Sequence, residues 1–457
     1  MRGLDAFAHR LIGAVPFGSR MQPHVARLAA FGDQGLQGVA NLAVNIVLAR
    51  SLTHEGFATI GTMLGVHYFV ASLHRTAIVL PFILDVGQGD DGGTDADGRW
   101  WWLNLAWLAA IAVCLAAIAG IAAWLGGPNE SNAWFVDAMA LAVLVTPALQ
   151  FYEFGRRCLF QAGLPVTAAL ASGCYLLASL GLALALLRFD VSATAGAAAW
   201  LGAGVLGGAV AAWALPPGRP RLREGFEIWS HNRGFAFWQT MTSIPHAIYN
   251  ASVVVLVGLI NGPLAAAAFN AARSITNPAV SMVTAVDSLD KPRAARALAS
   301  DGLAGLRQSV GKTRRLLALV TGLYLGTLII FAEPILMAAF GPKYADQTLE
   351  IRILGLVFFA MCMNQPSDTF LIVLRASRLL LTLRIVTASV AVGFLLLARP
   401  YGLVGCCLAL LATHLFNLVA LRIGERIASR RFLDGGAGSD ARTGPAPRRY
   451  AAARSGE

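Results

Sequence analysis

Apolar runs of about 20 residues recur along almost the whole chain, and they limit what it can fold into. Runs of this length match a helix that crosses a bilayer. Backbone groups in lipid must bond within their own segment, so helices are the expected elements. Charged residues make up only 13% of the chain, whereas soluble proteins hold about 25%. The sequence therefore predicts an all-α polytopic membrane protein.

About 12 spans are predicted, in two groups of six. They cover roughly residues 28–49, 57–84, 100–125, 133–152, 164–187, 193–215, 235–260, 263–286, 315–338, 350–372, 379–398 and 402–422. A loop with four arginines divides the groups. We therefore expect a first six-helix lobe at 1–215, a cytoplasmic loop at 216–234, a second lobe at 235–424, and a basic, disordered cytoplasmic tail at 425–457.

The distribution of basic residues predicts the orientation. Alternate turns and both termini hold about 28 of the 36 lysines and arginines, which the positive-inside rule assigns to the cytoplasm. Both termini are therefore expected there. The net charge of +11 is explained by contact with membrane lipids and gives no reason to expect nucleic acid.

The first helix of each half carries a polar stripe. Residues spaced three or four apart share one helix face. The stripes are Asp33, Gln37, Asn41 and Asn45 in the first half, and Gln239, Ser243, His246 and Asn250 in the second. Matching features in two halves are typical of an internal repeat around a midplane cavity, although a chance match of two polar helices is the alternative.

The second helix of each half carries an arginine, Arg75 or Arg273. A cation at the bilayer centre costs roughly 2.5–3.5 kcal/mol, so such a residue normally faces a wet cavity or an anion. His74 adjoins Arg75 and is expected to line the same cavity. Guanidinium groups suit phosphates, and amides and hydroxyls of the stripes suit sugar hydroxyls. The sequence thus predicts an anion-binding cavity between two lobes.

Acidic residues are scarce in the predicted spans. Asp33 near the cytoplasmic end of the first span is a candidate for proton coupling, for capping the helix, or for pairing with a basic residue of the cytoplasmic face. Glu153 adjoins Arg156 and Arg157, and an ordinary ion pair is expected.

The sequence shows no catalytic constellation, and we expect neither a metal nor a cofactor. No Ser/His/Asp or Cys/His set is recognisable in the sequence. None of the six cysteines belongs to a CxxC pair. Gly311-Lys312-Thr313 resembles the end of a phosphate-binding loop, but Leu306 stands where the first glycine belongs. Transport without nucleotide hydrolysis is therefore expected.

Four stretches resemble the Wzx-type polysaccharide flippases of the MOP superfamily. They are 48–61 (LARSLTHEGFATIG), 153–163 (EFGRRCLFQAG), 270–298 (NAARSITNPAVSMVTAVDSLDKPRAARAL) and 340–346 (FGPKYAD). Each motif is weak by itself, and their order and spacing carry the resemblance over nearly the whole chain.

The resemblance implies a V-shaped pair of lobes that works by alternating access. It implies a multi-pass protein of the bacterial inner membrane that moves undecaprenyl-pyrophosphate-linked oligosaccharide to the outer leaflet, for exopolysaccharide or O-antigen. Relatives hold cationic residues in the cavity, on helices that include the second and the eighth. The resemblance therefore implies a diphosphate-binding role for Arg75 and Arg273. Some relatives have a basic residue in the first helix, where this chain has Asp33 and amides. Polysaccharide polymerase or export machinery is an implied partner.

Two alternatives remain open. A multidrug (MATE-type) antiporter of the same superfamily often carries cations, which the two arginines would repel. A membrane glycan polymerase or ligase usually needs a large outer loop with catalytic residues, and the outer turns here are short.

Overall fold

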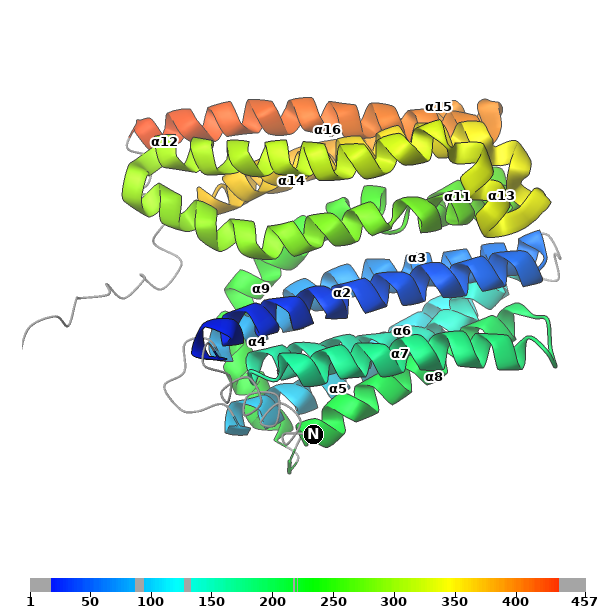
Figure 1. The fold of residues 1–457 in the computed structure, drawn as a ribbon, viewed down its shortest axis with the longest axis horizontal. Coiled ribbons are helices and arrows are strands. Elements are labelled where there is room, and N and C mark those ends of the chain that lie inside the picture. Colours follow the sequence, from blue (N-terminus) through cyan, green and yellow to red (C-terminus); the bar gives the residue numbers. More distant parts are fainter. Residues whose placement is uncertain (1–17, 87–93, 127–132, 217, 220, 435–457) are drawn as a thin grey trace, which may run out of the picture.

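The computed structural model describes residues 18–86, 94–126, 133–216, 218–219 and 221–434, and these form helices joined by short turns (Figure 1). No strand occurs in these ranges. The all-α prediction is confirmed. The first 17 residues and most of the predicted tail, from 435 onward, lie outside the described residues.

The first lobe forms the lower layer in Figure 1. Its elements are α2 (Gly18–Ser51), α3 (His54–His74), the π-helix η1 (Arg75–Val79), α4 (Leu80–Val86), α5 (Thr94–Gly126), α6 (Ala133–Gln161), α7 (Pro165–Leu186) and α8 (Ala193–Ala214). Small residues bring these helices close, as expected in lipid. A Cβ at Gly204 of α8 would lie 2.8 Å from the backbone of Ala148 in α6.

The second lobe forms the upper layer, and α9 crosses between the layers (Figure 1). Its elements are α9 (Leu222–Asn250), α10 (Val253–Asn261), α11 (Pro263–Thr276), α12 (Pro278–Ile330), α13 (Ala332–Phe340), η3 (Gly341–Gln347), α14 (Thr348–Val373), α15 (Ser377–Ala398), η4 (Arg399–Tyr401) and α16 (Gly402–Leu433). α12 is a hairpin of two helices that reverses at Gly302, whose φ is 61°. Glycine adopts this left-handed conformation without a Cβ penalty.

Several helices extend beyond the expected boundaries. α9 begins at Leu222, inside the segment 216–234 that was expected to be a loop, and α16 continues to Leu433, past 424. Polar residues extend these helices, since Arg223 and Glu227 pair one turn apart at 3.1 Å. Hydropathy marks the apolar part of a helix and not its end.

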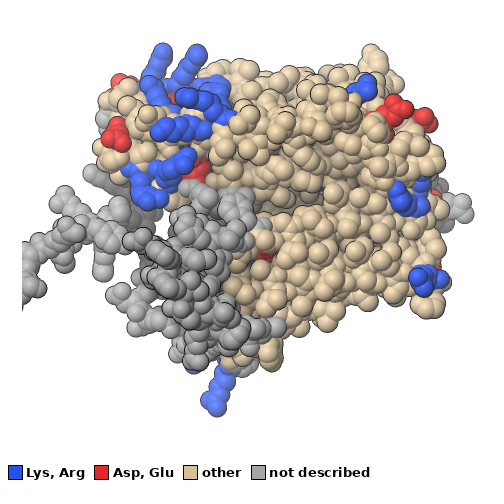
Figure 2. Space-filling view, viewed as in Figure 1, with Lys and Arg blue, Asp and Glu red and all other residues tan. Residues whose placement is uncertain are grey.

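The apolar surface agrees with a membrane protein. Eight helical stretches among the described residues are long and apolar enough to cross a membrane, and α9 with α10, bent by 48°, forms one more such pair. Figure 2 shows a broad middle band almost free of charge, with lysines and arginines gathered at one end of the upper lobe, where α12 reverses. We call this the Gly302 end. The opposite end, where α2 passes into α3, is the α2–α3 end.

The lobes meet mainly through α2 and α3 of the first lobe. α3 packs against α9, α10 and α11, and α2 packs against α11, α12 and α13. Gly61 and Gly65 allow α3 to approach α10 and α11 of the second lobe closely. A Cβ at Gly61 would lie 2.8 Å from the Asn270 side chain, and one at Gly65 would lie 2.5 Å from Val254. This GxxxG pair lets helices from different lobes approach.

Candidate functional site

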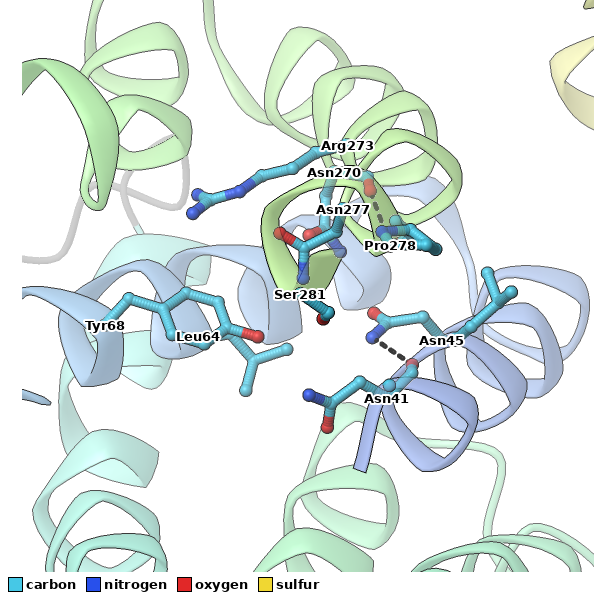
Figure 3. A pocket seen from close by; sticks show the side chains of 12 residues that line it. Asn41, Asn45, Leu64, Tyr68, Asn270, Arg273, Asn277, Pro278 and Ser281 are labelled. Carbon is cyan, nitrogen blue, oxygen red and sulfur yellow. Dashed lines mark hydrogen bonds between the residues drawn. The ribbon is translucent and has the colours of Figure 1, made fainter. Parts of the chain in front are cut away.

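A pocket lies at this junction and takes residues from both lobes (Figure 3). The space between the atoms of its lining, open solvent included, is about 410 Å³. Its lining comprises Gly38, Asn41, Leu42 and Asn45 from α2, Leu64 and Tyr68 from α3, Asn270, Arg273 and Ser274 from α11, and Asn277, Pro278 and Ser281 at the start of α12. This lining is rich in amides and contains no carboxylate.

Helical periodicity produces the polar lining on both sides. In α2, Asn41 and Asn45 are one turn apart and share a face, as the sequence predicts. Facing them, Asn270, Asn277 and Ser281 continue with Arg273 along one stripe of α11 and α12. The sequence analysis missed this second stripe, although the spacing was present, because it singled out Arg273 alone in 263–286.

Arg273 is the cation of the pocket. Its NH1 donates a 2.8 Å hydrogen bond to the carbonyl of Ala251, at the break between α9 and α10. Its guanidinium carbon lies 5.1 Å from the centre of the Tyr68 ring, which is cation–π distance. Among the described residues, no carboxylate forms an ion pair with Arg273. Its positive charge is therefore available to an anion.

Two other arginines, one buried and one partly buried, have carboxylate partners that Arg273 lacks among the described residues. Arg156 of α6 pairs with Asp33 and Glu153 in the first lobe. In the second lobe Arg384 of α15 lies 3.4 Å from Asp368 of α14. Each lobe thus balances a guanidinium internally, whereas Arg273, at the junction, forms no ion pair with a carboxylate in the part of the chain that the structure describes.

Asp33 belongs to a network inside the first lobe. It is fully buried, pairs with Arg156, and accepts a 2.5 Å hydrogen bond from Ser172 Oγ of α7. Glu153 pairs with Arg156 and, at 2.9 Å, with Arg157, so the expected ion pair is confirmed. Asp33 therefore has a basic partner, which is one of the roles that the sequence left open.

Arg75 lies apart from this pocket. It begins the π-helix η1, is exposed, and does not belong to the pocket lining. Beside it, the Ser72 and Ser243 hydroxyls lie 2.6 Å apart and join α3 to α9, and the Thr76 and Thr240 hydroxyls lie 3.2 Å apart and join η1 to α9. π-helical turns are frequent at functional sites. The structure thus gives the two predicted arginines different surroundings.

The remaining predicted residues also lie outside the pocket lining. Ser243, Gln239, His246 and Asn250 are on α9, where Ser243 bonds to α3 and the His246 ring lies 5.5 Å from that of Tyr249. His74 is buried in the first lobe, and its Nε2 lies 2.7 Å from Asn104 Oδ1 of α5. Of the predicted substrate-binding set, the structure brings together Arg273, Asn41 and Asn45 in this pocket.

A pair of reciprocal contacts closes the junction at the α2–α3 end. Arg50 Nε donates to the Ala339 carbonyl at 2.8 Å, and its NH2 donates to Ala338 at 2.6 Å. Lys343 Nζ donates to the Ala49 carbonyl at 3.0 Å and to that of Leu52. We call these four bonds the clasp.

Aromatic packing supports the clasp. Tyr344 is buried, and its ring lies 5.3 Å from His54 and 6.2 Å from Phe57, both of the first lobe. Sequence reasoning missed these contacts, because main-chain carbonyl acceptors leave no mark in a sequence.

The described residues contain no group of three His, Cys, Asp or Glu side chains placed to hold a metal ion. The chemistry of the pocket is therefore that of one guanidinium with amides, hydroxyls and one phenol ring. Such groups bind anions and polar neutral molecules through hydrogen bonds.

The sequence of this chain matches the model of a known protein family. The model of a family described as polysaccharide biosynthesis protein matches residues 47–349. No curated protein matches the chain.

Three solved structures show the fold. An inward-facing multidrug resistance MATE family transporter of the MOP superfamily is 18% identical, has a TM-score of 0.68, and covers 88% of this chain and 96% of its own. An outward-facing MATE family transporter of the same superfamily is 18% identical and has a TM-score of 0.56. The match covers 93% of this chain and 98% of the transporter. A MOP superfamily transporter from Pyrococcus furiosus, described as having a binding pocket of reverse polarity that suggests a different function, is 17% identical, with a TM-score of 0.58 and coverages of 93% and 98%.

The family match spans most of the chain, and the similar structures share its two-lobed helical architecture. The chain therefore belongs to the polysaccharide biosynthesis protein family, and its fold is that of the MOP superfamily transporters it resembles.

Proposed function

We propose that the protein moves undecaprenyl-pyrophosphate-linked oligosaccharide units across the bacterial inner membrane by alternating access, for the synthesis of surface polysaccharide. The observation that carries this proposal is Arg273, a guanidinium that has no carboxylate partner among the described residues and lies in an amide-lined pocket between the lobes. A diphosphate carries several negative charges, and arginine offers it a planar fork of donors. In a partly dry pocket this attraction is stronger than at an exposed surface.

The amides and hydroxyls suit the glycan part of this substrate. Asn41, Asn45, Asn277 and Ser281 offer hydrogen bonds to sugar hydroxyls. The prenyl chain needs no pocket, because it stays in lipid beside the junction. Arg75 and the polar residues of α9, which border the α3–α9 contact, would meet the cargo outside this pocket.

The positions of the charges and of the clasp suggest the transport state. Basic residues gather at the Gly302 end, so the positive-inside rule makes it the cytoplasmic end (Figure 2). The clasp then closes the periplasmic end, and the pocket is loaded from the cytoplasm. A higher TM-score with an inward-facing transporter than with an outward-facing one supports the same state.

The drug-antiporter alternative has less support. A cationic cargo would need carboxylates, and the pocket lining contains Arg273 and no acidic residue. Polymerase or export machinery that receives the glycan outside, and anionic lipids around the basic end, are the partners we propose.

The decisive experiment deletes the protein and locates the stalled lipid-linked intermediate with a label that reaches one leaflet. The proposal requires accumulation in the inner leaflet. Accumulation of single units in the outer leaflet would mean that the protein acts as a polymerase or ligase. Drug efflux on expression, with no change in surface glycan, would favour the antiporter.

A further inference from the structure

Tyr68 and Arg273 reach the pocket from opposite lobes. Tyr68 belongs to α3 of the first lobe, Arg273 belongs to α11 of the second, and both residues are partly exposed. The guanidinium carbon of Arg273 lies over the Tyr68 ring, 5.1 Å from its centre. Figure 3 shows the Arg273 side chain extending to the side of the pocket where Tyr68 lies. The phenol ring is therefore a direct neighbour of the cation that would bind the diphosphate.

The contact with the ring does not use the hydrogen-bond donors of Arg273. A guanidinium has five N–H donors in its plane, and attraction to the face of a ring uses none of them. The bond from NH1 to the Ala251 carbonyl uses one. A carboxylate partner would use more, since Arg156 donates to its two carboxylate partners through Nε, NH1 and NH2. Tyr68 thus holds the cation without occupying the donors that an anion needs.

The ring is itself held in place. Tyr68 packs against the main hydrophobic core, and its ring lies 5.4 Å from that of His67. A long side chain that is already oriented loses less conformational freedom when it binds a ligand, so it binds more tightly. A fixed ring therefore gives Arg273 a fixed position before the anion arrives.

The contact also depends on how the lobes are arranged. α3 and α11 pack directly against each other, and they come closest where Gly61 meets Asn270. Tyr68 lies two turns from Gly61 on α3, and Arg273 lies one turn from Asn270 on α11. Alternating access, as proposed above, separates these helices when the pocket opens to the outer side. The ring then moves away from the guanidinium.

We propose that Tyr68 is a positioning residue that ties the anion affinity of Arg273 to the arrangement of the lobes. While the lobes meet at α3 and α11, the ring holds the guanidinium with its remaining donors available, and the diphosphate is bound firmly. When the lobes separate, the ring is lost and the affinity falls, which favours release on the outer side. This inference rests on the proposed function, because it names the residue through which the same site would hold and release its anion.

The test measures the binding of inorganic pyrophosphate to the purified full-length protein by calorimetry, with Arg273→Ala as the baseline for binding elsewhere. Tyr68→Phe keeps an aromatic ring over the cation, whereas Tyr68→Leu keeps apolar bulk without a ring. We expect Tyr68→Leu to weaken the Arg273-dependent binding about 5- to 30-fold, the range that a partly desolvated cation–π contact supplies. Tyr68→Phe should retain most of the affinity.

Tyr324→Leu is the matched control. Tyr324 is also partly exposed and also contacts α11, through a 2.6 Å hydrogen bond from its hydroxyl to the Ile275 carbonyl, but it lies outside the pocket lining. Its replacement disturbs α11 without removing a ring from Arg273, so the affinity should change by less than about twofold. A loss equal to that of Tyr68→Leu would show a general disturbance of α11 and overturn the role of Tyr68.

A second background tests the dependence on the lobes. Gly61→Phe forces α3 away from α11, because even a Cβ there would lie 2.8 Å from Asn270. In this background Tyr68→Leu should cause little further loss of pyrophosphate binding, since the ring and the cation are already apart. An equal loss in both backgrounds would overturn the link to the lobe arrangement. The clasp variant, Arg50→Ala with Lys343→Ala, replaces Gly61→Phe if the latter does not fold.

The outcomes separate this inference from the proposed function. Binding that is lost in Arg273→Ala but unchanged in Tyr68→Leu overturns the role of Tyr68 and leaves the anion site intact. Equal weakening in Tyr68→Phe and Tyr68→Leu also overturns it, since the hydroxyl and not the ring would then be responsible. Wild-type binding no stronger than that of Arg273→Ala overturns the anion site on which the proposed function depends. Melting temperatures show which variants fold, and Tyr68→Met replaces Tyr68→Leu if the latter does not.

Discussion

Arg50 and Lys343 cross the junction between the lobes in opposite directions, and each binds main-chain carbonyls of the other's lobe. Arg50 lies in the last turn of α2, and Lys343 lies in η3. The last carbonyls of a helix lack intrahelical partners, and cations near them are favourable. These hydrogen bonds form only while the two helix ends are adjacent, so they break when the lobes separate at this end.

Arg50→Ala with Lys343→Ala should open this end of the molecule. Hydrogen bonds from charged groups contribute about 1.5–3 kcal/mol each, so the open population should rise at least tenfold. The measurement is labelling of Ser281→Cys from the outer side by a membrane-impermeant thiol reagent, with the six native cysteines replaced by alanine. Arg399→Ala is the control, because its exposed side chain is also beside the α2–α3 end and outside the clasp. Unchanged labelling would show that the clasp does not hold the junction shut.

Arg273→Ala should abolish most transport, and Arg273→Lys should retain part of it. The alanine removes the charge, while lysine keeps a point charge without the planar fork. We expect a loss of about 100-fold for alanine, as for one strong charge-assisted contact worth about 3 kcal/mol. Surface polysaccharide at matched protein levels gives the readout.

Arg75→Ala provides the comparison for Arg273. Arg75 is exposed and outside the pocket, so a smaller loss is expected. Normal polysaccharide in both alanine variants would exclude the two arginines from the mechanism.

Gly61→Ala should separate α3 from α11. The new Cβ would lie 2.8 Å from Asn270, so the helices or the asparagine must shift. Overpacking of this kind costs about 1–3 kcal/mol, which would lower the melting temperature and slow transport. Gly35→Ala is the control, because a Cβ there meets nothing within 4 Å. Equal melting temperatures for the two variants would contradict a tight contact at Gly61.

Asp33→Asn tests whether the Asp33–Arg156 pair is structural. Removing one partner of a buried pair typically costs about 3–5 kcal/mol, although Glu153 still pairs with Arg156 here and moderates the loss. We therefore expect a lower melting temperature and transport that keeps its dependence on any proton gradient. A variant that melts normally but no longer responds to the gradient would instead identify Asp33 as a coupling residue.

The sequence predicted the helical class and the two lobes because lipid imposes a minimum span length, which apolar runs reveal directly. It also predicted the α2 face with Asn41 and Asn45, since a stripe spaced by four stands out in an apolar helix. The facing stripe of Asn270 and Asn277 escaped notice because it runs across the break between α11 and α12, where Pro278 begins the next helix. Which two stripes meet depends on tertiary packing, and no single helix records that.

Local departures from regular α-helix explain why the two predicted arginines have different surroundings. Arg75 and Arg273 occupy matching helices, yet one begins a π-helical turn and the other binds the carbonyl of a broken helix. These local departures from α-helix decide where each guanidinium lies. Pattern analysis assumes regular helices, so it cannot detect them.

The break between α9 and α10 has a consequence for release. Its 48° bend frees the Ala251 carbonyl, which anchors Arg273. If this helix straightened, the carbonyl would return to its own hydrogen-bond ladder and Arg273 would keep only Tyr68 as a neighbour. The guanidinium would then be held less firmly in the position from which we propose that it binds an anion. Unbending one backbone segment would thereby weaken the proposed site without any change in its charge.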